Sequence, residues 1–222
     1  MKRRELFSGF DTVAPGACLD TSDGNRCLAN LIPNALFRTH ENEEVRFYDD
    51  VLKGKTVMVM MMYTTCETAC PAATQRMVEI HRRYLADRMG KDLFLCNITL
   101  KPHEDDPAAM AAYAKAHGAL LPGWTFLTGD RYDIDTLRYT FFSHDHIGID
   151  LDDSVHAGMI KIINEPLGRW LHADAFVSTR TLLEHIEWAK PLGSYEEELQ
   201  KNIRLQQQID ADVEKHGYRR TV

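Results

Sequence analysis

Two cysteines, Cys66 and Cys70, stand four positions apart in the segment "YTTCETACP", between a strongly apolar run and a proline. A thiol pair at this spacing can exchange a disulfide, coordinate a soft metal ion, or link the chain covalently. Thiolate sulfur is both the nucleophile of disulfide exchange and a ligand that suits Cu(I). The segment therefore raises a choice between redox chemistry, metal binding and a structural link.

The position of the pair favours thiolate chemistry over two ordinary core cysteines. Pro71 is compatible with the first turn of a helix, so Cys70 is expected at or next to the N-cap and Cys66 in the preceding loop. The positive end of the helix dipole then stabilises a thiolate. Few structural needs call for paired thiols at an exposed helix start.

A copper site needs a further ligand when the ion is Cu(II), because two thiolates satisfy Cu(I) alone but Cu(II) takes more donors, typically an imidazole. The segment "HDHIGIDLDDSVHAGMIKIIN" offers His144, His146 and His156. His156 directly precedes an apolar strand, which is a rigid element that can direct its ring. His144 and His146 lie in an acidic, loop-like stretch. Spacing alone does not select His156.

The elements that must position these residues are indicated by the hydrophobic pattern. The run "TVMVMMMY" at 56–63 is apolar on both faces, so we expect a buried central strand whose methionines fill the core. The other expected strands are 35–40, 44–48, 92–100, 124–129, 158–164 and 168–173. The expected helices are 71–89, 107–118, 131–142 and 178–190. This order predicts an α/β fold with a mixed sheet flanked by helices.

Three parts are expected along the chain: an irregular N-terminal arm at 1–30, the α/β domain at 31–190 and a C-terminal amphipathic helix within 191–222. Cys18 and Cys27 in the arm either close a small disulfide loop or remain free thiols. The apolar stripe on the final helix predicts that this helix packs on the domain's own surface. The alternative is that the helix joins two subunits. Its apolar face consists of Tyr195, Leu199, Ile203, Leu205, Ile209 and Val213.

Composition narrows the class of protein. The chain has 222 residues and a formal net charge of −7, which argues against nucleic acid as a partner. No apolar run approaches the roughly 20 residues of a membrane span. Lys2-Arg3-Arg4 begins like an export signal, but no apolar core follows, so the chain is either cytosolic or begins after a removed segment. Cys96, in an apolar run, is expected to be a buried core thiol.

Four segments of the chain resemble the Sco/SenC family: "GKTVMVMMMYTTCETACPAAT", "ITLKPHEDDPAAMAAYA", "PGWTFLTGDRYDIDTLR" and "SVHAGMIKIINEPLGRW". The resemblance covers roughly residues 31–190 and implies a thioredoxin-like fold. It also implies a copper chaperone that serves an acceptor such as a cytochrome c oxidase subunit. By the family pattern the copper ligands are Cys66, Cys70 and His156, and this pattern, unlike spacing, distinguishes His156 from the other histidines.

Two features depart from the family pattern. Lys101-Pro102 follows the second strand, where family members usually have Asp-Pro. If that loop approaches the thiols, the Lys101 charge opposes an added Cu(II) charge, so we expect weaker Cu(II) binding than is usual in the family. The family works in the periplasm, at a membrane or in the mitochondrial intermembrane space, whereas this sequence displays neither a complete signal nor an anchor. A cytoplasmic location therefore stays open.

The main alternative function is a thiol-disulfide oxidoreductase that acts through Cys66 and Cys70. Typical thioredoxins carry C-x-x-C and a facing cis-proline, whereas this spacing is one residue longer and the segment 154–157 contains no proline. A peroxiredoxin requires T-x-x-C, which Tyr63 and Glu67 rule out. A non-catalytic interaction module is disfavoured because all three ligand positions are filled. The sequence leaves the oligomeric state open.

Overall fold

A computed structural model describes residues 31–142, 158–189 and 195–216 of the chain, with the side chains of the last range described from 203 to 215. Several predictions concern residues outside these ranges and stay predictions. They are the irregular arm with Cys18 and Cys27, and the three histidines His144, His146 and His156.

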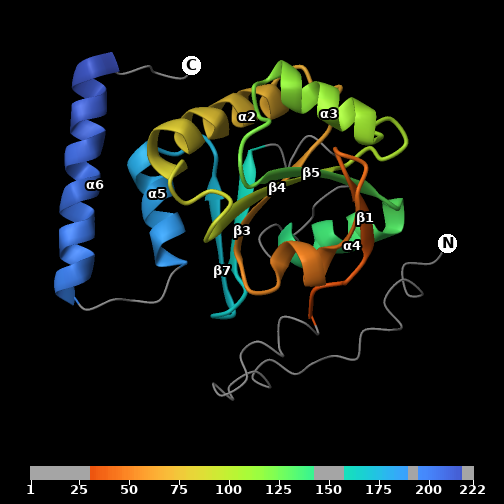
Figure 1. The fold of residues 1–222 in the computed structure, drawn as a ribbon, viewed down its shortest axis with the longest axis horizontal. Coiled ribbons are helices and arrows are strands. Elements are labelled where there is room, and N and C mark those ends of the chain that lie inside the picture. Colours follow the sequence, from red (N-terminus) through yellow and green to blue (C-terminus); the bar gives the residue numbers. More distant parts are fainter. Residues whose placement is uncertain (1–30, 143–157, 190–194, 217–222) are drawn as a thin grey trace.

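One mixed sheet forms the centre of the described chain, with the strand order β2-β1-β5-β4-β3-β6-β7 (Figure 1). Its strands are β1 (Leu36–Thr39), β2 (Glu44–Arg46), β3 (Thr56–Met62), β4 (Leu93–Thr99), β5 (Trp124–Gly129), β6 (Met159–Asn164) and β7 (Arg169–Asp174). β3, β4 and β5 are parallel, and the other neighbours pair antiparallel. The predicted mixed sheet is confirmed.

Helices cover both faces of this sheet (Figure 1). They are η1 (Phe47–Leu52), α2 (Ala69–Ile80), η2 (His81–Leu85), α3 (Pro107–Ala116), α4 (Arg131–Phe142), α5 (Thr179–Trp188) and α6 (Tyr195–His216). Residues of α2, α3 and α5 share one hydrophobic core with the sheet, and residues of η1 and α4 share a second core on its other face. None of the helices in the described ranges is long and apolar enough to cross a membrane.

β3 is buried along its whole length because it faces a core on each side. Met58, Met60 and Met62 contribute to the core under α2, α3 and α5. The alternate residues, such as Val59 and Met61, contribute to the core under α4. This arrangement explains why the strand is apolar on both faces and confirms that its methionines fill the core. Cys96 in β4 is 1% exposed, as expected.

Two predicted elements have bounds that differ most from the structure. The strand expected at 44–48 ends at Arg46, because Phe47 and Tyr48 turn into the second core, where the Tyr48 hydroxyl donates to Glu165 at 2.6 Å. The helix expected at 71–89 begins at Ala69 instead of Pro71. Proline is tolerated in the first turn because the N–H groups there have no intrahelical acceptor. Regular α-helix ends at Ile80 and continues as η2 to Leu85.

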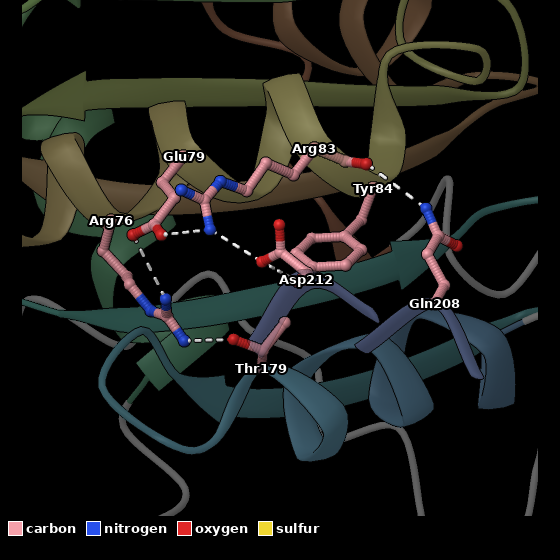
Figure 2. Close-up of polar contacts among 7 residues, drawn as sticks. All are labelled: Arg76, Glu79, Arg83, Tyr84, Thr179, Gln208 and Asp212. Carbon is pink, nitrogen blue, oxygen red and sulfur yellow. Dashed lines mark hydrogen bonds and ion pairs between the residues drawn. The ribbon is translucent and has the colours of Figure 1, made fainter. Parts of the chain in front are cut away.

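The C-terminal helix α6 lies on the domain's own surface, as predicted, although polar side chains provide much of the contact (Figure 2). The Asp212 carboxylate accepts hydrogen bonds from Arg83 at 2.6 Å and from the Tyr84 hydroxyl at 2.7 Å. Gln208 donates to the backbone carbonyl of Arg83. Leu205 packs against the core beneath α5, whereas Ile203 is 42% exposed, so only part of the predicted apolar face makes contact.

Replacing Asp212 by alanine is expected to loosen α6. The change removes one carboxylate that joins α6 to both Arg83 and Tyr84, and a hydrogen bond to a charged group contributes about 1.5–3 kcal/mol. Hydrogen exchange at α6 amides should therefore accelerate by about tenfold or more. Asp210→Ala is the matched control, because Asp210 contacts Gln206 within the same helix. Equal acceleration in both variants would contradict the assigned role.

Candidate metal and thiol site

The cysteine pair lies where β3 ends and α2 begins. β3 stops at Met62, and a turn follows in which the Cys66 N–H donates to the Tyr63 carbonyl at 3.3 Å. Thr68 is the N-cap of α2, so Cys70 belongs to the first helical turn and Cys66 to the preceding loop. This geometry confirms that Cys66 lies in the loop before the helix, whereas Cys70 lies two residues beyond the N-cap and not at or next to it as predicted. The junction stands at the carboxyl edge of the parallel strands, where binding sites of α/β sheets commonly form.

The two sulfurs are neighbours but differ in exposure. The backbone N–H of Cys70 donates to Cys66 Sγ at 3.4 Å, so the start of the helix directs an amide at that sulfur. Cys66 is 9% exposed and Cys70 is 3% exposed, and both are free thiols. Both thiols are therefore buried, although the sequence indicated an exposed helix start, and Cys66 is the less buried of the two.

Their environments separate the two pKa values. Burial alone would raise the pKa of Cys66, but hydrogen bonds from the backbone N–H groups of Cys70 and Thr68, and from the side chains of Cys70 and Tyr63, lower it to about 7. Burial raises the pKa of Cys70 to about 12, helped by its hydrogen bond to Cys66 and by the charges of Cys66 and Asp105. Near pH 7 about half of the Cys66 thiols are therefore ionised, while Cys70 keeps its proton.

Alkylation of the reduced protein is expected to follow this difference. Only thiolate reacts, and the pKa of Cys66 is lowered from 9.0 to about 7, so its reaction with iodoacetamide should accelerate as pH rises and level off above about pH 8. Cys70 should stay unreactive over the same range, because its pKa is about 12. Mass spectrometry of digested samples quenched at each pH assigns the label to a cysteine. Equal labelling of both thiols at neutral pH would contradict the asymmetry.

A buried carboxylate underlies the cysteine turn. Asp105 is 0% exposed and accepts hydrogen bonds from the backbone N–H and the hydroxyl of Thr64, and from the hydroxyl of Thr99. The sequence did not single out Asp105, and the adjacent Asp106 is the N-cap of α3. The available signal was the P-x-x-D-x-P pattern, in which Asp105 is the central aspartate.

The loop that carries Lys101 approaches the cysteine turn, which is the condition for the weaker Cu(II) binding expected from the sequence. The Lys101 ammonium lies 4.5 Å from the centre of the Tyr63 ring and 3.5 Å from the Thr65 hydroxyl. Glu104 lies 3.7 Å from the same ammonium. A positive charge therefore stands beside the residue that precedes Cys66, partly balanced by one carboxylate.

His156 lies outside the described residues, but the strand that follows it is described. β6 begins at Met159 and pairs with β3 so that Ile160 is opposite Met60. The chain therefore enters β6 at the edge of the sheet where β3 leaves toward the cysteines. Within the described residues, Cys66 and Cys70 belong to no group of three or more His, Cys, Asp or Glu side chains that could hold a metal ion.

Comparison with known proteins places this site in a family. Residues 32–166, more than half of the chain, match the family model described as SCO1/SenC. The chain belongs to the SCO1/SenC family. The match includes both cysteines, Asp105 and His156, whereas α6 lies beyond it. The resemblance noted in the sequence is confirmed.

A curated relative is the SCO1 protein homolog of Bacillus subtilis (strain 168), which is 28% identical over 78 residues. The matched part is 35% of this chain and 39% of the relative. The aligned region thus spans well under half the length of that relative.

Solved structures show the fold. A SCO1/SenC family lipoprotein from Bacillus anthracis str. Ames has a TM-score of 0.58 and 17% identity, over 71% of this chain and 94% of that one. BsSco, described with a disulfide switch and as a member of the Sco family of cytochrome c oxidase assembly proteins, has a TM-score of 0.56 and 20% identity, over 72% and 92%. Yeast Sco1 with copper bound has a TM-score of 0.53 and 17% identity, over 70% and 92%. The SCO1/SenC chain described here has their thioredoxin-like fold.

Proposed function

We propose that this protein is a copper metallochaperone that holds one copper ion through Cys66, Cys70 and His156. The observation that carries the proposal is the pair of adjacent, unequal thiols at the strand-to-helix junction of a SCO1/SenC chain. Thiolate donors suit Cu(I), and the lowered pKa of Cys66 makes one available near neutral pH. Copper bound to the yeast structure of the same fold supports this choice of ion.

Binding of Cu(I) requires the second thiol to lose its proton. Cys70 has a pKa of about 12, so copper must displace the proton that Cys70 shares with Cys66. The affinity for Cu(I) should then increase with pH, and the low exposure of both sulfurs limits access by water and competing ligands. His156 would complete the site for Cu(II), and the entry of β6 beside the end of β3 supports this assignment.

The copper acceptor that we propose is a subunit of a cytochrome c oxidase. The support comes from the family, because BsSco is described as a member of a family of cytochrome c oxidase assembly proteins. We infer a periplasmic or membrane-associated location on similar grounds, since the Bacillus anthracis neighbour is described as a lipoprotein.

A second candidate function is reduction of a disulfide in the acceptor. The observation that favours it is the same inequality. Cys66, the less buried of the two, ionises near neutral pH while Cys70 keeps its proton, which suits attack by one sulfur and resolution by the other. The structure with a disulfide switch in BsSco is consistent with redox chemistry on this fold.

Anaerobic titration tests the proposal. A chaperone should take up one Cu(I) per chain and retain it on gel filtration, while it reduces a model disulfide slowly. Fast reduction of the disulfide together with negligible copper retention would reject the chaperone in favour of the reductase. The reduction potential of the Cys66/Cys70 pair adds a quantitative criterion, because a strongly reducing pair suits electron delivery.

Replacing Lys101 by aspartate is expected to strengthen Cu(II) binding. The ammonium beside Thr65 opposes the charge added by Cu(II), whereas a carboxylate at this position would attract it. We expect the Cu(II) affinity of the variant to rise by roughly tenfold, or about 1–2 kcal/mol, which is usual when the sign of a partly exposed charge is reversed. Competition with a Cu(II) chelator measures it, and Lys53→Asp, at an exposed position in the turn before β3, controls for net charge. Unchanged Cu(II) affinity in the Lys101 variant would reject the hypothesis.

A further inference from the structure

Asp105 is a fully buried carboxylate that joins three segments at the carboxyl edge of the sheet. Its oxygens accept from the Thr64 N–H at 3.1 Å, from the Thr64 hydroxyl and from the Thr99 hydroxyl. Thr64 belongs to the cysteine turn, and Thr99 is the last residue of β4. Asp105 itself is fixed by its N–H, which donates to the Lys101 carbonyl at 2.9 Å.

These bonds fasten the turn that presents Cys66. The turn is short, because the N–H of Cys66 donates to the carbonyl of Tyr63, three residues earlier. Thr64 lies inside this turn and is the residue that connects it to Asp105. A buried carboxylate with several hydrogen bonds is costly to disturb, since loss of one donor leaves charge without compensation. The turn is therefore held against β4 by a rigid contact.

Direct coordination of copper is not the role that the geometry indicates for this carboxylate. Asp105 belongs to no group of three potential metal ligands within the described residues, and its oxygens are already engaged by Thr64 and Thr99. Residues that support metal ligands without binding the ion themselves commonly set the orientation of those ligands.

We propose that Asp105 is a positioning residue that, through Thr64, holds the Cys66 sulfur at the distance and orientation required to share an ion with Cys70. For copper, this inference rests on the proposed function. The same contact also limits how far the Cys66 turn can open. It therefore affects the accessibility of the Cys66 thiol whether or not copper binds.

The first experiment compares Asp105→Asn with Asp106→Asn. Both remove one charge from the same loop, and Asp106 caps α3 through the Ala109 N–H without contacting the cysteine turn. Competition with a chromophoric Cu(I) chelator should give about a tenfold lower affinity for Asp105→Asn, the usual scale for loss of a group behind a ligand, and little change for Asp106→Asn.

The second comparison remains informative if Asp105→Asn folds poorly. Thr64→Val and Thr99→Val each delete one hydroxyl donor to Asp105 with little change in shape, but only Thr64 lies in the turn. Thr64→Val should lower Cu(I) affinity by about tenfold and Thr99→Val by much less. Equal losses in the two variants, or unchanged affinity in Thr64→Val, would overturn the positioning role, because the carboxylate would then serve general stability alone.

A readout that does not use copper separates this inference from the proposed function. Iodoacetamide should modify Cys66 about tenfold faster in Thr64→Val than in wild type when both are reduced and kept well above the pKa of that thiol, because the turn opens more often. Wild-type protein that fails to bind Cu(I) would reject the chaperone, yet this rate would still decide the positioning role. An unchanged rate overturns it.

Discussion

Replacing Cys66 or Cys70 by serine is expected to abolish Cu(I) binding. The two sulfurs are adjacent donors at one junction, and a Cu(I) site that depends on two thiolates would have no soft substitute when one of them is lost. A serine hydroxyl is a hard, protonated donor at neutral pH and does not replace it. Anaerobic titration of each variant should give less than one-tenth of the wild-type copper content after gel filtration, whereas His156→Ala should mainly weaken Cu(II) binding.

The chain supplies a matched control for this experiment. Cys96 is a third free thiol, 1% exposed within β4, and burial raises its pKa well above the ordinary range. Cys96→Ala removes one sulfur from the protein and should leave copper content at the wild-type value. Full copper retention by Cys66→Ser or Cys70→Ser would show that copper binds elsewhere, and the proposed site would be wrong.

Replacing Gly123 by alanine is expected to destabilise the fold strongly, because a side chain at this position has no room. Gly123 has a φ of +71°, and a Cβ there would lie 2.2 Å from the backbone nitrogen of Gly90 and 2.8 Å from its Cα. Gly90 also has a positive φ and follows the turn after η2, and its backbone lies closer to Gly123 than a side chain at position 123 would allow. Neither can move without displacing β5 or that turn. We expect the free energy of unfolding to fall by more than about 4 kcal/mol, measured by urea denaturation.

Gly54→Ala separates the clash from the backbone strain. Gly54 has a φ of +74°, nearly the same conformation, but a Cβ there would meet nothing within 4 Å. Strain alone should therefore cost about 1–2 kcal/mol in this variant. Similar losses in the two variants would mean that the Gly90–Gly123 approach relaxes easily, contrary to the geometry.

Much of the fold could be predicted because local pattern and tertiary structure agree. β3 is a seven-residue strand with every residue buried, and its apolar run has no other satisfactory environment than a central strand covered on both faces. The hairpin of β6 and β7 and the helix α5 were indicated equally directly by the sequence. The cysteine pair was identified for the same reason, because the helix start is encoded within a few residues of it.

The errors arose where tertiary contacts decide. Phe47 and Tyr48 continue a strand-like pattern, but their burial in the second core and the bond to Glu165, distant in sequence, end β2 at Arg46. Asp105 and Asp106 are adjacent and chemically identical in the sequence. In the sequence only the P-x-x-D-x-P pattern sets Asp105 apart. In the structure, the convergence of Thr64 and Thr99, which lie on different segments, distinguishes a buried carboxylate from an exposed helix cap.

α6 contacts the segment formed by α2 and η2 at the end that lies away from the thiols. From Cys70 in the first turn of α2 to Arg83 in η2, the chain advances roughly 20 Å at the rise of a helix. The thiols and the contacts of α6 with Arg83 therefore lie at opposite ends of this segment. The family match ends at residue 166, so it covers the cysteine turn but not the helix that contacts the far end of this segment.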